Sequence, residues 1–244
     1  MERGLSENIK KIYRSISHAA MRAGREPHDV RLIAVTKNVA ADVIVRALEI
    51  GQRDFGENRV QEFRAKLADI GNLLGVPPGG NLKGYRPRWH LIGHLQKNKA
   101  KMAVELFDLI HSVDSGELAE MVNSSAEKIN KTQRILIQVK LSDEERKYGI
   151  SQGKVIWLLE RLRGMRHLKV EGLMTIPPYF ANPQQARPFF RKLREIRDKA
   201  EAEGFPLKEL SMGMSNDFEI AVEEGATMVR VGTAIFGERK KEEA

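Results

Sequence analysis

Cysteine is absent from the 244 residues of this sequence, which excludes disulfide bonds and thiolate metal ligands and fits a reducing compartment. No stretch reaches the roughly 18 consecutive apolar residues that a membrane-spanning helix needs. The N-terminal segment MERGLSENIKKIYRSI is charged from its second residue and lacks the apolar region of a secretory signal. We therefore expect a cytosolic protein without a membrane span.

The composition of the sequence is that of a basic globular protein. Hydrophobic residues make up 41% of the sequence, enough for a substantial core, and charged residues make up 30%. The net charge of +8 makes an anionic partner plausible, whether nucleic acid or a phosphorylated metabolite. The densest basic cluster (Lys97, Lys99, Lys101) fits a solvated helix face. No aromatic stacking motif supports nucleic acid, so that alternative rests on charge alone, and salt-sensitive RNA or DNA retention would support it.

Apolar runs of strand length alternate with amphipathic segments of helix length along the whole chain. The predicted strands are residues 31–36, 53–56, 89–93, 109–113, 134–141, 168–176, 207–212 and 228–237. The predicted helices are residues 5–24, 40–50, 58–70, 96–105, 115–130, 151–163, 183–203 and 215–225, the last with Ser215 as its N-cap. Residues 71–87 are predicted to be a loop because glycine and proline are dense there.

Eight strands with intervening helices predict an α/β fold, a single (β/α)8 TIM-type barrel with an additional N-terminal helix. The glycine fingerprint of dinucleotide-binding sheets is missing after the first strand, which disfavours a doubly wound open sheet. About 10 residues follow the last strand, so we expect residues 1–244 to form one domain.

Lys37 follows the apolar run IAVT without a break, which places it at the carboxyl end of the first predicted strand. Function in such barrels sits at these strand ends. Desolvation there favours the neutral amine, the form that attacks an aldehyde to give an imine. A lysine whose ammonium reaches solvent fits this position equally well.

The segment LSMGMSNDFEIAVEEG predicts a phosphate site. Gly213 permits a sharp turn between Ser211 and Ser215, and the free N–H groups of the next helix start attract anions. Ordinary helix capping would need Ser215 but gives no reason for the turn SMGMS. Gly232 and Thr233 follow the eighth strand and can face the same phosphate, since barrels often hold phosphate between the last two strands.

Arg230 lies two residues before Gly232 on an apolar strand, where a lone cation is costly unless it is paired. We therefore expect a partner for it at the barrel mouth. Together with Lys37, these features imply a phosphorylated aldehyde bound across that mouth.

Six ordered motifs, AVTKN, FGENRVQE, WHLIGHLQKNK, GLMTI, LSMGMSNDFEIAV and VRVGTAIFG, resemble the pyridoxal phosphate homeostasis proteins, which are related to the barrel domain of bacterial alanine racemase. The resemblance implies that pyridoxal 5′-phosphate (PLP) is the cofactor, bound as an imine on Lys37. It further implies that Asn58 and His90 line the pocket, that Met174 packs near the ring and that Arg230 faces the pyridine nitrogen. The residues implied to contact the phosphate are Ser211, Met214, Ser215, Gly232 and Thr233.

The resemblance also implies a function in the storage, delivery or buffering of PLP, without strong catalysis. An arginine at the pyridine nitrogen leaves that atom unprotonated and weakens the ring as an electron sink. The second base of alanine racemase comes from a further domain that this chain lacks, although weak amino-acid racemase activity stays the main alternative. We expect a monomer that passes PLP to PLP-dependent apoenzymes.

Two positions bear on these implications. Lys140 replaces the asparagine that the family usually has after the glutamine and valine of the fifth strand, and it could change the charge of the pocket or offer a second amine. His90 and His94 are spaced four apart, but their segment is predicted to be a strand followed by a glycine turn, with no third ligand evident. We therefore expect no metal site.

Overall fold

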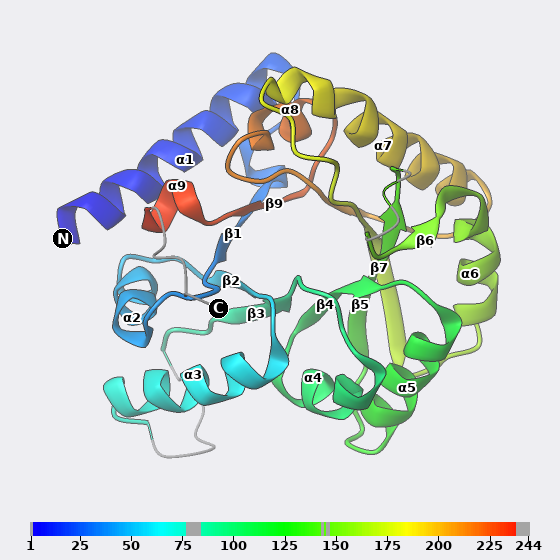
Figure 1. Ribbon diagram of the computed structural model, residues 1–244, viewed down its shortest axis with the longest axis horizontal. Coiled ribbons are helices and arrows are strands. Elements are labelled where there is room, and N and C mark those ends of the chain that lie inside the picture. Colours follow the sequence, from blue (N-terminus) through cyan, green and yellow to red (C-terminus); the bar gives the residue numbers. More distant parts are fainter. Residues whose placement is uncertain (1, 77–83, 143, 145–146, 238–244) are drawn as a thin grey trace.

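The computed structural model describes residues 2–76, 84–142, 144 and 147–237, and its centre is a ring of parallel strands (Figure 1). Short apolar runs rich in β-branched and aliphatic residues form these strands. The eight strands of the ring are β1 (Arg31–Val35), β2 (Asp54–Glu57), β3 (Arg88–Leu91), β4 (Leu109–Val113), β5 (Gln133–Lys140), β7 (Leu168–Met174), β8 (Glu209–Ser211) and β9 (Met228–Val231).

The ring is closed because its first and last strands pair with each other. Strand β1 lies parallel to β2, with Ala34 opposite Phe55, and also parallel to β9, with Arg31 opposite Met228. The remaining neighbours pair in chain order, and β4 pairs with β5 on the far side of the ring. The predicted TIM-type barrel is confirmed. A two-residue strand that was not predicted, β6 (Ile150–Ser151), extends the sheet beside β5.

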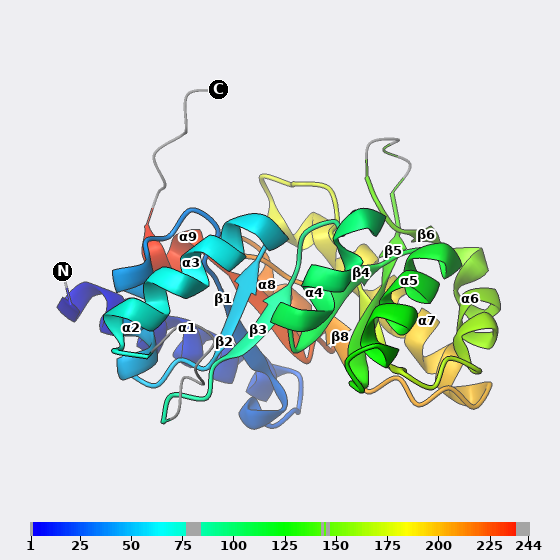
Figure 2. The same cartoon turned by 90° about the horizontal axis from the view of Figure 1, so that it is seen from below.

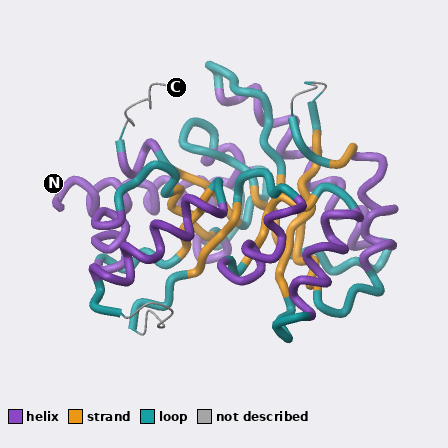
Figure 3. Tube along the Cα trace, turned by 60° about the horizontal axis from the view of Figure 1, so that its bottom comes forward, coloured by secondary structure: helices purple, strands orange, loops and turns teal. Residues whose placement is uncertain are grey.

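Helices surround the barrel, as the views from below and from an oblique angle show (Figures 2 and 3). The α-helices are α1 (Glu2–Arg22), α2 (Ala41–Glu49), α3 (Val60–Leu73), α4 (Ala100–Leu106), α5 (Gly116–Glu127), α6 (Val155–Leu162), α7 (Arg187–Ala202), α8 (Phe218–Glu223) and α9 (Thr233–Phe236). The short 3-10 helices are η1 (Pro27–Asp29), η2 (Lys97–Lys99), η3 (Gln152–Lys154) and η4 (Pro183–Ala186).

The N-terminal helix α1 belongs to this outer layer and packs against α8 and α9. Its buried residues recur at helical spacing, as Ile9, Ile12, Ile16, Ala19 and Ala20 show. The predicted additional N-terminal helix is therefore confirmed, and its apolar stripe covers the segment that closes the barrel.

Two apolar layers hold the fold together, one outside the sheet and one inside it. Successive side chains of a strand point to opposite faces, so Leu32 and Ala34 of β1 pack against the helices. Ile33 points inward. The apolar residues of the barrel interior are Ile33, Leu109, Leu136, Met174 and Met228, with Ile176 packed against them. The rest of the interior is polar, and it includes the buried residues His90, His111, Ser211 and Arg230.

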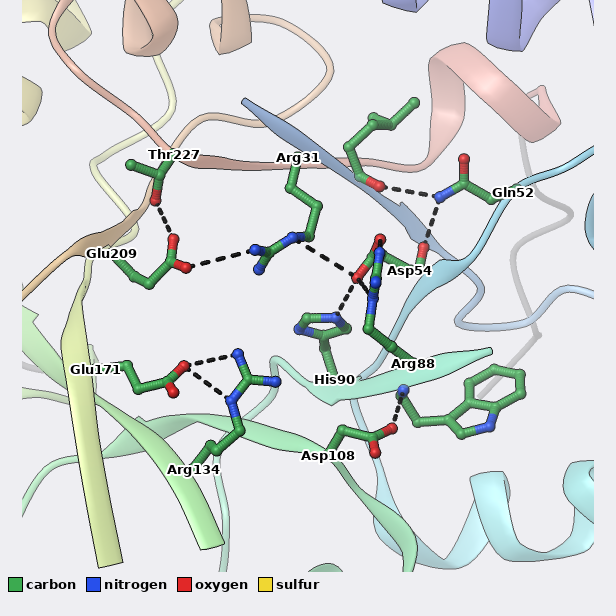
Figure 4. A network of polar contacts seen from close by, with 12 residues as sticks. Arg31, Gln52, Asp54, Arg88, His90, Asp108, Arg134, Glu171, Glu209 and Thr227 are labelled. Carbon is green, nitrogen blue, oxygen red and sulfur yellow. Dashed lines mark hydrogen bonds and ion pairs between the residues drawn. The ribbon is translucent and has the colours of Figure 1, made fainter. Parts of the chain in front are cut away.

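The amino ends of the strands carry a network of ion pairs, which we call the floor of the barrel (Figure 4). Asp54 accepts a hydrogen bond of 2.7 Å from Nε of Arg88 and lies 4.0 Å from Nε of Arg31. Arg31 also lies 3.5 Å from Glu209, and Arg134 contacts Glu171 at 2.7 Å. This end of a TIM barrel contributes to stability rather than chemistry, and it is the end opposite the predicted site.

Three predicted boundaries are wrong. The eighth strand was predicted to run to residue 237, but β9 ends at Val231 and Thr233–Phe236 is helical. Gly232, at φ −120° and ψ −73°, leaves the extended conformation and begins this helix. Ser215 is not an N-cap, because α8 begins at Phe218 with Asp217 as its cap. The predicted loop at 71–87 overlaps α3, which ends at Leu73, and residues 77–83 lie outside the described residues.

Gly213 and Gly204 provide a matched test of the turn after β8. Both have left-handed backbones, at φ +89° and +87°. A Cβ at Gly213 would lie 2.5 Å from Cβ of Ala221 and 2.9 Å from Cα of Phe218, whereas nothing lies within 4 Å of one at Gly204. We expect Gly204→Ala to lower the free energy of unfolding by about 1–2 kcal/mol, the cost of the left-handed conformation alone. Gly213→Ala should lower it by about 1–3 kcal/mol more, because of overpacking.

Urea titrations of both variants give these values. Equal losses in the two variants would contradict the close packing of the turn after β8 against α8.

Candidate functional site

Lys37 lies at the carboxyl end of β1, where the chain turns away from the barrel. Asn38 has a left-handed backbone at φ +55°, a conformation that asparagine tolerates, and the N–H of Val39 donates to the carbonyl of Thr36 at 3.0 Å. Lys66 of α3 donates to the same carbonyl at 2.7 Å and to Glu57 at 2.6 Å. The peptide that precedes Lys37 is therefore held at the barrel mouth.

Lys37 is half-buried and lines a cavity of about 640 Å³, which we call the lysine cavity. Other lining residues include Asn58, Gly93, His94 and Tyr148. Among the described residues, no hydrogen bond or ion pair involves the Lys37 amine. The amine is therefore available to a ligand in that cavity.

The residues predicted to hold phosphate line a second cavity of about 490 Å³, which we call the phosphate cavity. The predicted site residues that line it are Asn58, Met214, Ser215, Arg230, Gly232 and Thr233. Asn58, Gly93, His94 and Tyr148 line both cavities, so the two adjoin. The tertiary structure thus brings together the carboxyl ends of seven strands, β1, β2, β3, β5, β7, β8 and β9, around one mouth.

Two of these loops are fastened to each other. The hydroxyl of Ser215, after β8, accepts a hydrogen bond of 3.3 Å from the N–H of Gly232, after β9. The carboxylate of Asp217 accepts one of 2.6 Å from the N–H of Met214 and so closes the turn. The N–H groups of Ser215 and Thr233 have no acceptor among the described residues, and such groups form anion sites.

Arg230 is a buried cation beside this turn, with 3% of its surface exposed. It donates to the hydroxyl of Ser211 at 2.6 Å and to the carbonyl of Thr175 at 2.9 Å. Burial lowers its pKa to about 10, so it stays charged at neutral pH. None of the ion pairs within the described ranges includes it. The expected partner at the mouth is thus a hydroxyl and a carbonyl. The charge of Asp217 acts to raise the pKa of Arg230, but Asp217 forms no ion pair with it.

Three predicted site residues lie deeper in the barrel and line neither cavity. Met174 belongs to the apolar interior. His90 contacts His111 at 2.9 Å and Asp54 at 3.0 Å. Ser211 lies between His111 and Arg230, at 2.9 and 2.6 Å. Ser211 contacts Arg230 directly, and His90 is connected to Ser211 through His111. We therefore place these residues beneath the mouth, where they hold its residues in position.

Several residues that line the mouth could not be selected from sequence patterns. Tyr148 stacks on His94 with ring centroids 3.6 Å apart, and Gln138 donates to the Tyr148 carbonyl at 3.1 Å. Asn216 donates to the carbonyl of Phe180 at 3.0 Å. Tyr148 lies in a loop beyond β5, so no strand-end rule could identify it. Lys140 is half-buried and lines neither cavity.

His90 and His94 do not converge. His90 faces the barrel interior, whereas His94 lies at the mouth against Tyr148. In the part of the chain that the structure describes, no group of three His, Asp or Glu residues could hold a metal ion. No helix among those residues has the length and apolar character to cross a bilayer.

A closed parallel barrel with a lysine and the phosphate cavity at one mouth places this protein in the class of TIM barrels whose geometry suits a phosphate-bearing ligand. Comparisons with known proteins identify the family within that class. The family described as "Alanine racemase, N-terminal domain" matches residues 8–240. The "Pyridoxal phosphate homeostasis protein" of Aquifex aeolicus (strain VF5) is 43% identical over 235 residues, which are 96% of this chain and 98% of the relative.

Solved structures agree with this placement. PipY of Synechococcus elongatus PCC7942, solved with PLP bound, superimposes with a TM-score of 0.80 at 37% identity, over 96% of this chain and 100% of PipY. An alanine racemase of Clostridium difficile 630, at 14% identity and a TM-score of 0.67, shares the fold; the match covers 98% of this chain and 58% of the racemase. The chain belongs to the alanine racemase N-terminal domain family and, within it, to the pyridoxal phosphate homeostasis proteins.

The buried histidines predict a stability profile that depends on pH. Burial lowers the pKa of His90 and lowers that of His111 well below its usual value of 6.5. As the pH falls below 6.5 the unfolded chain takes up two protons that the folded chain does not, so the folded state loses stability. The slope can reach about 2.7 kcal/mol per pH unit. Asp54 adds to the loss below about pH 3.8, because hydrogen bonds from His90 and Arg88 outweigh its burial and lower its pKa to about 2.

Urea unfolding at about pH 7.5 and 5.5 measures this loss. His28→Gln is the control, since the side chain of His28 is exposed and its removal should leave the slope unchanged. A free energy of unfolding that is equal at both pH values would show that the two buried rings are not neutral in the fold.

Proposed function

We propose that this protein binds PLP as an imine on Lys37 and serves intracellular PLP homeostasis by storing, buffering or delivering the cofactor. The observation that carries the proposal is the buried charge of Arg230, which forms no ion pair among the described residues and lines the phosphate cavity. An uncompensated buried cation is costly, and an anionic ligand removes that cost. The Lys37 amine in the adjoining cavity supplies the group that an aldehyde needs.

The residues present fit the cofactor at both of its ends. PLP supplies an aldehyde that condenses with a primary amine. In our proposal, Ser215, Gly232 and Thr233 bind the phosphate with Met214 beside them, Arg230 faces the ring nitrogen and Asn58 borders the ring. Ser211, His90 and Met174 support this set from below. We extend the proposal to residues 1–244 as one cytoplasmic PLP-binding domain, acting as a monomer with PLP-dependent apoenzymes as recipients.

The same site does not favour efficient racemisation. Racemisation needs a base on each face of the substrate, and Lys37 supplies one. The stacked pair of His94 and Tyr148 lines both cavities, and we assign neither ring the part of a second base. Weak amino-acid racemase activity is the alternative, and a substantial rate with purified protein would favour it.

Borohydride trapping tests the imine. We expect the purified protein with PLP to show a yellow imine band and to become permanently labelled on reduction. Lys37→Ala should show neither. Lys99→Ala is the matched control, because Lys99 lines the same cavity and its loss should leave the label in place. Failure of the wild-type protein to take up PLP would overturn the proposal, and loss of the label in Lys99→Ala alone would move the imine to Lys99.

Removal of the Ser215 hydroxyl tests the phosphate cavity. We expect Ser215→Ala to weaken PLP retention about tenfold or more, because a hydrogen bond to a charged group contributes about 1.5–3 kcal/mol. The imine on Lys37 should still form at saturating PLP. Ser125→Ala is the control, since Ser125 lies on α5 and its exposed hydroxyl donates to the carbonyl of Met121. Equal affinities of the two variants, measured by equilibrium dialysis, would place the phosphate elsewhere.

A further inference from the structure

A continuous chain of hydrogen bonds crosses the barrel interior from the floor to the mouth. It joins Asp54 to His90 at 3.0 Å, His90 to His111 at 2.9 Å and His111 to Ser211 at 2.9 Å. It ends where Arg230 donates to Ser211 at 2.6 Å. We call these five residues the interior chain. They come from β2, β3, β4, β8 and β9, so only barrel closure brings them together.

The two ends fix the direction of every hydrogen bond between them. An arginine can only donate and an ionised carboxylate can only accept. Nε2 of His90 must therefore carry the proton that bonds to Asp54 (Figure 4). If the ring is neutral, Nδ1 of His90 accepts, and it accepts from Nε2 of His111.

The directions of the two remaining hydrogen bonds, nearer the mouth, follow in the same way. With its proton on Nε2, a neutral His111 accepts at Nδ1 from the hydroxyl of Ser211. The hydroxyl hydrogen of Ser211 is then used, and its oxygen accepts from Arg230. Every donor in the interior chain thus points from the mouth to the floor, and neighbouring hydrogen bonds that are aligned in this way polarise one another.

We propose that Asp54 acts through His90, His111 and Ser211 to hold Arg230 in place, and that the interior chain sets the tautomers of both histidines and the orientation of the guanidinium at the ligand site. The five donors of an arginine lie in a rigid fork. Two of them are held by Ser211 and by the carbonyl of Thr175, and Arg230 also lines the phosphate cavity. His90, His111, Ser211 and Asp54 are therefore positioning residues.

The interior chain holds charge in place and does not carry protons through the barrel. Transfer along its whole length would take a proton from Arg230, with a pKa of about 10, to Asp54, with a pKa of about 2. Such a transfer is strongly unfavourable. Arg88 and Arg31 also face Asp54 from the floor and help to keep it ionised, so the acceptor end of the interior chain is fixed by charge.

The tautomers provide a test that is independent of any ligand. Nitrogen-15 NMR of histidine-labelled protein at about pH 7 should show His90 and His111 both neutral and both protonated at Nε2. A proton on Nδ1 of either ring, or a charged His90, would overturn the proposed direction. This measurement needs no PLP, so its result stands whether or not the proposed function is correct.

A double-mutant cycle tests whether Asp54 and Ser211 are coupled in ligand binding. Its readout is the PLP dissociation constant, so this test rests on the proposed function. Asp54→Asn keeps the shape and removes the charge, and it should weaken PLP binding about fivefold or more. Asp108→Asn is the matched control, because Asp108 is also a floor carboxylate but accepts from the backbone N–H of Trp89 outside the interior chain. Its effect should stay below about twofold.

Ser211→Ala removes the link at the mouth, so the addition of Asp54→Asn to it should have no further effect. Additive losses would show that Asp54 and Ser211 act separately and would overturn the proposal. If Asp54→Asn does not fold, His111→Phe takes its place in the cycle, since it breaks the interior chain and leaves the floor charges intact. Equal affinities of His111→Phe and wild-type protein would overturn it as well.

Discussion

The burial of one positive charge inside the barrel is the constraint on which the rest of the site depends. Arg230 lies on β9 with its side chain in the interior, where an ion without compensation costs several kcal/mol. Within the described residues, Asp217 acts on Arg230 by charge but no carboxylate forms an ion pair with it. The fold holds the guanidinium with a hydroxyl and a carbonyl and leaves the charge directed at the mouth. An anion that binds at the mouth would lower the free-energy cost of this buried charge and so stabilise the barrel. That gain in stability is the physical basis of the proposed binding function.

The elements around Arg230 also present positively polarised groups to the mouth. The turn after β8 and the start of α9 meet through Ser215 and Gly232, so the unpaired N–H groups of two loops add to the positive field. Lys37 approaches from the next strand of the ring, since β1 lies beside β9. A phosphate and an aldehyde on one small molecule would therefore span neighbouring strands, with no further domain required to hold either end.

The comparison with alanine racemase places this arrangement in context. The two share a barrel, but the chain corresponds to 58% of the racemase that it matches. The proposed function needs only the barrel. His94 and Tyr148 stack at its mouth, where they line both cavities.

The sequence alone determined the barrel, because hydrophobic periodicity and turn residues are local signals that recur in every strand and helix. It also determined Lys37, Ser215 and Gly232 as mouth residues, since the carboxyl ends of parallel strands meet at one face. It misplaced the N-cap of α8 and the end of β9, where Asp217 and Gly232 decide the backbone through contacts within the turns.

Only the tertiary structure decided which residues touch the cavities and which support them from below. The sequence predicts His90 and Ser211 as pocket residues, yet their partners are His111 and Arg230. The contact of His111 with Ser211 joins residues 100 positions apart in the chain. Tyr148 could not be identified as a mouth residue from the sequence for the same reason, since its stacking on His94 joins two loops that follow different strands. Contacts of this kind arise from closure of the ring, and no local pattern of residues encodes them.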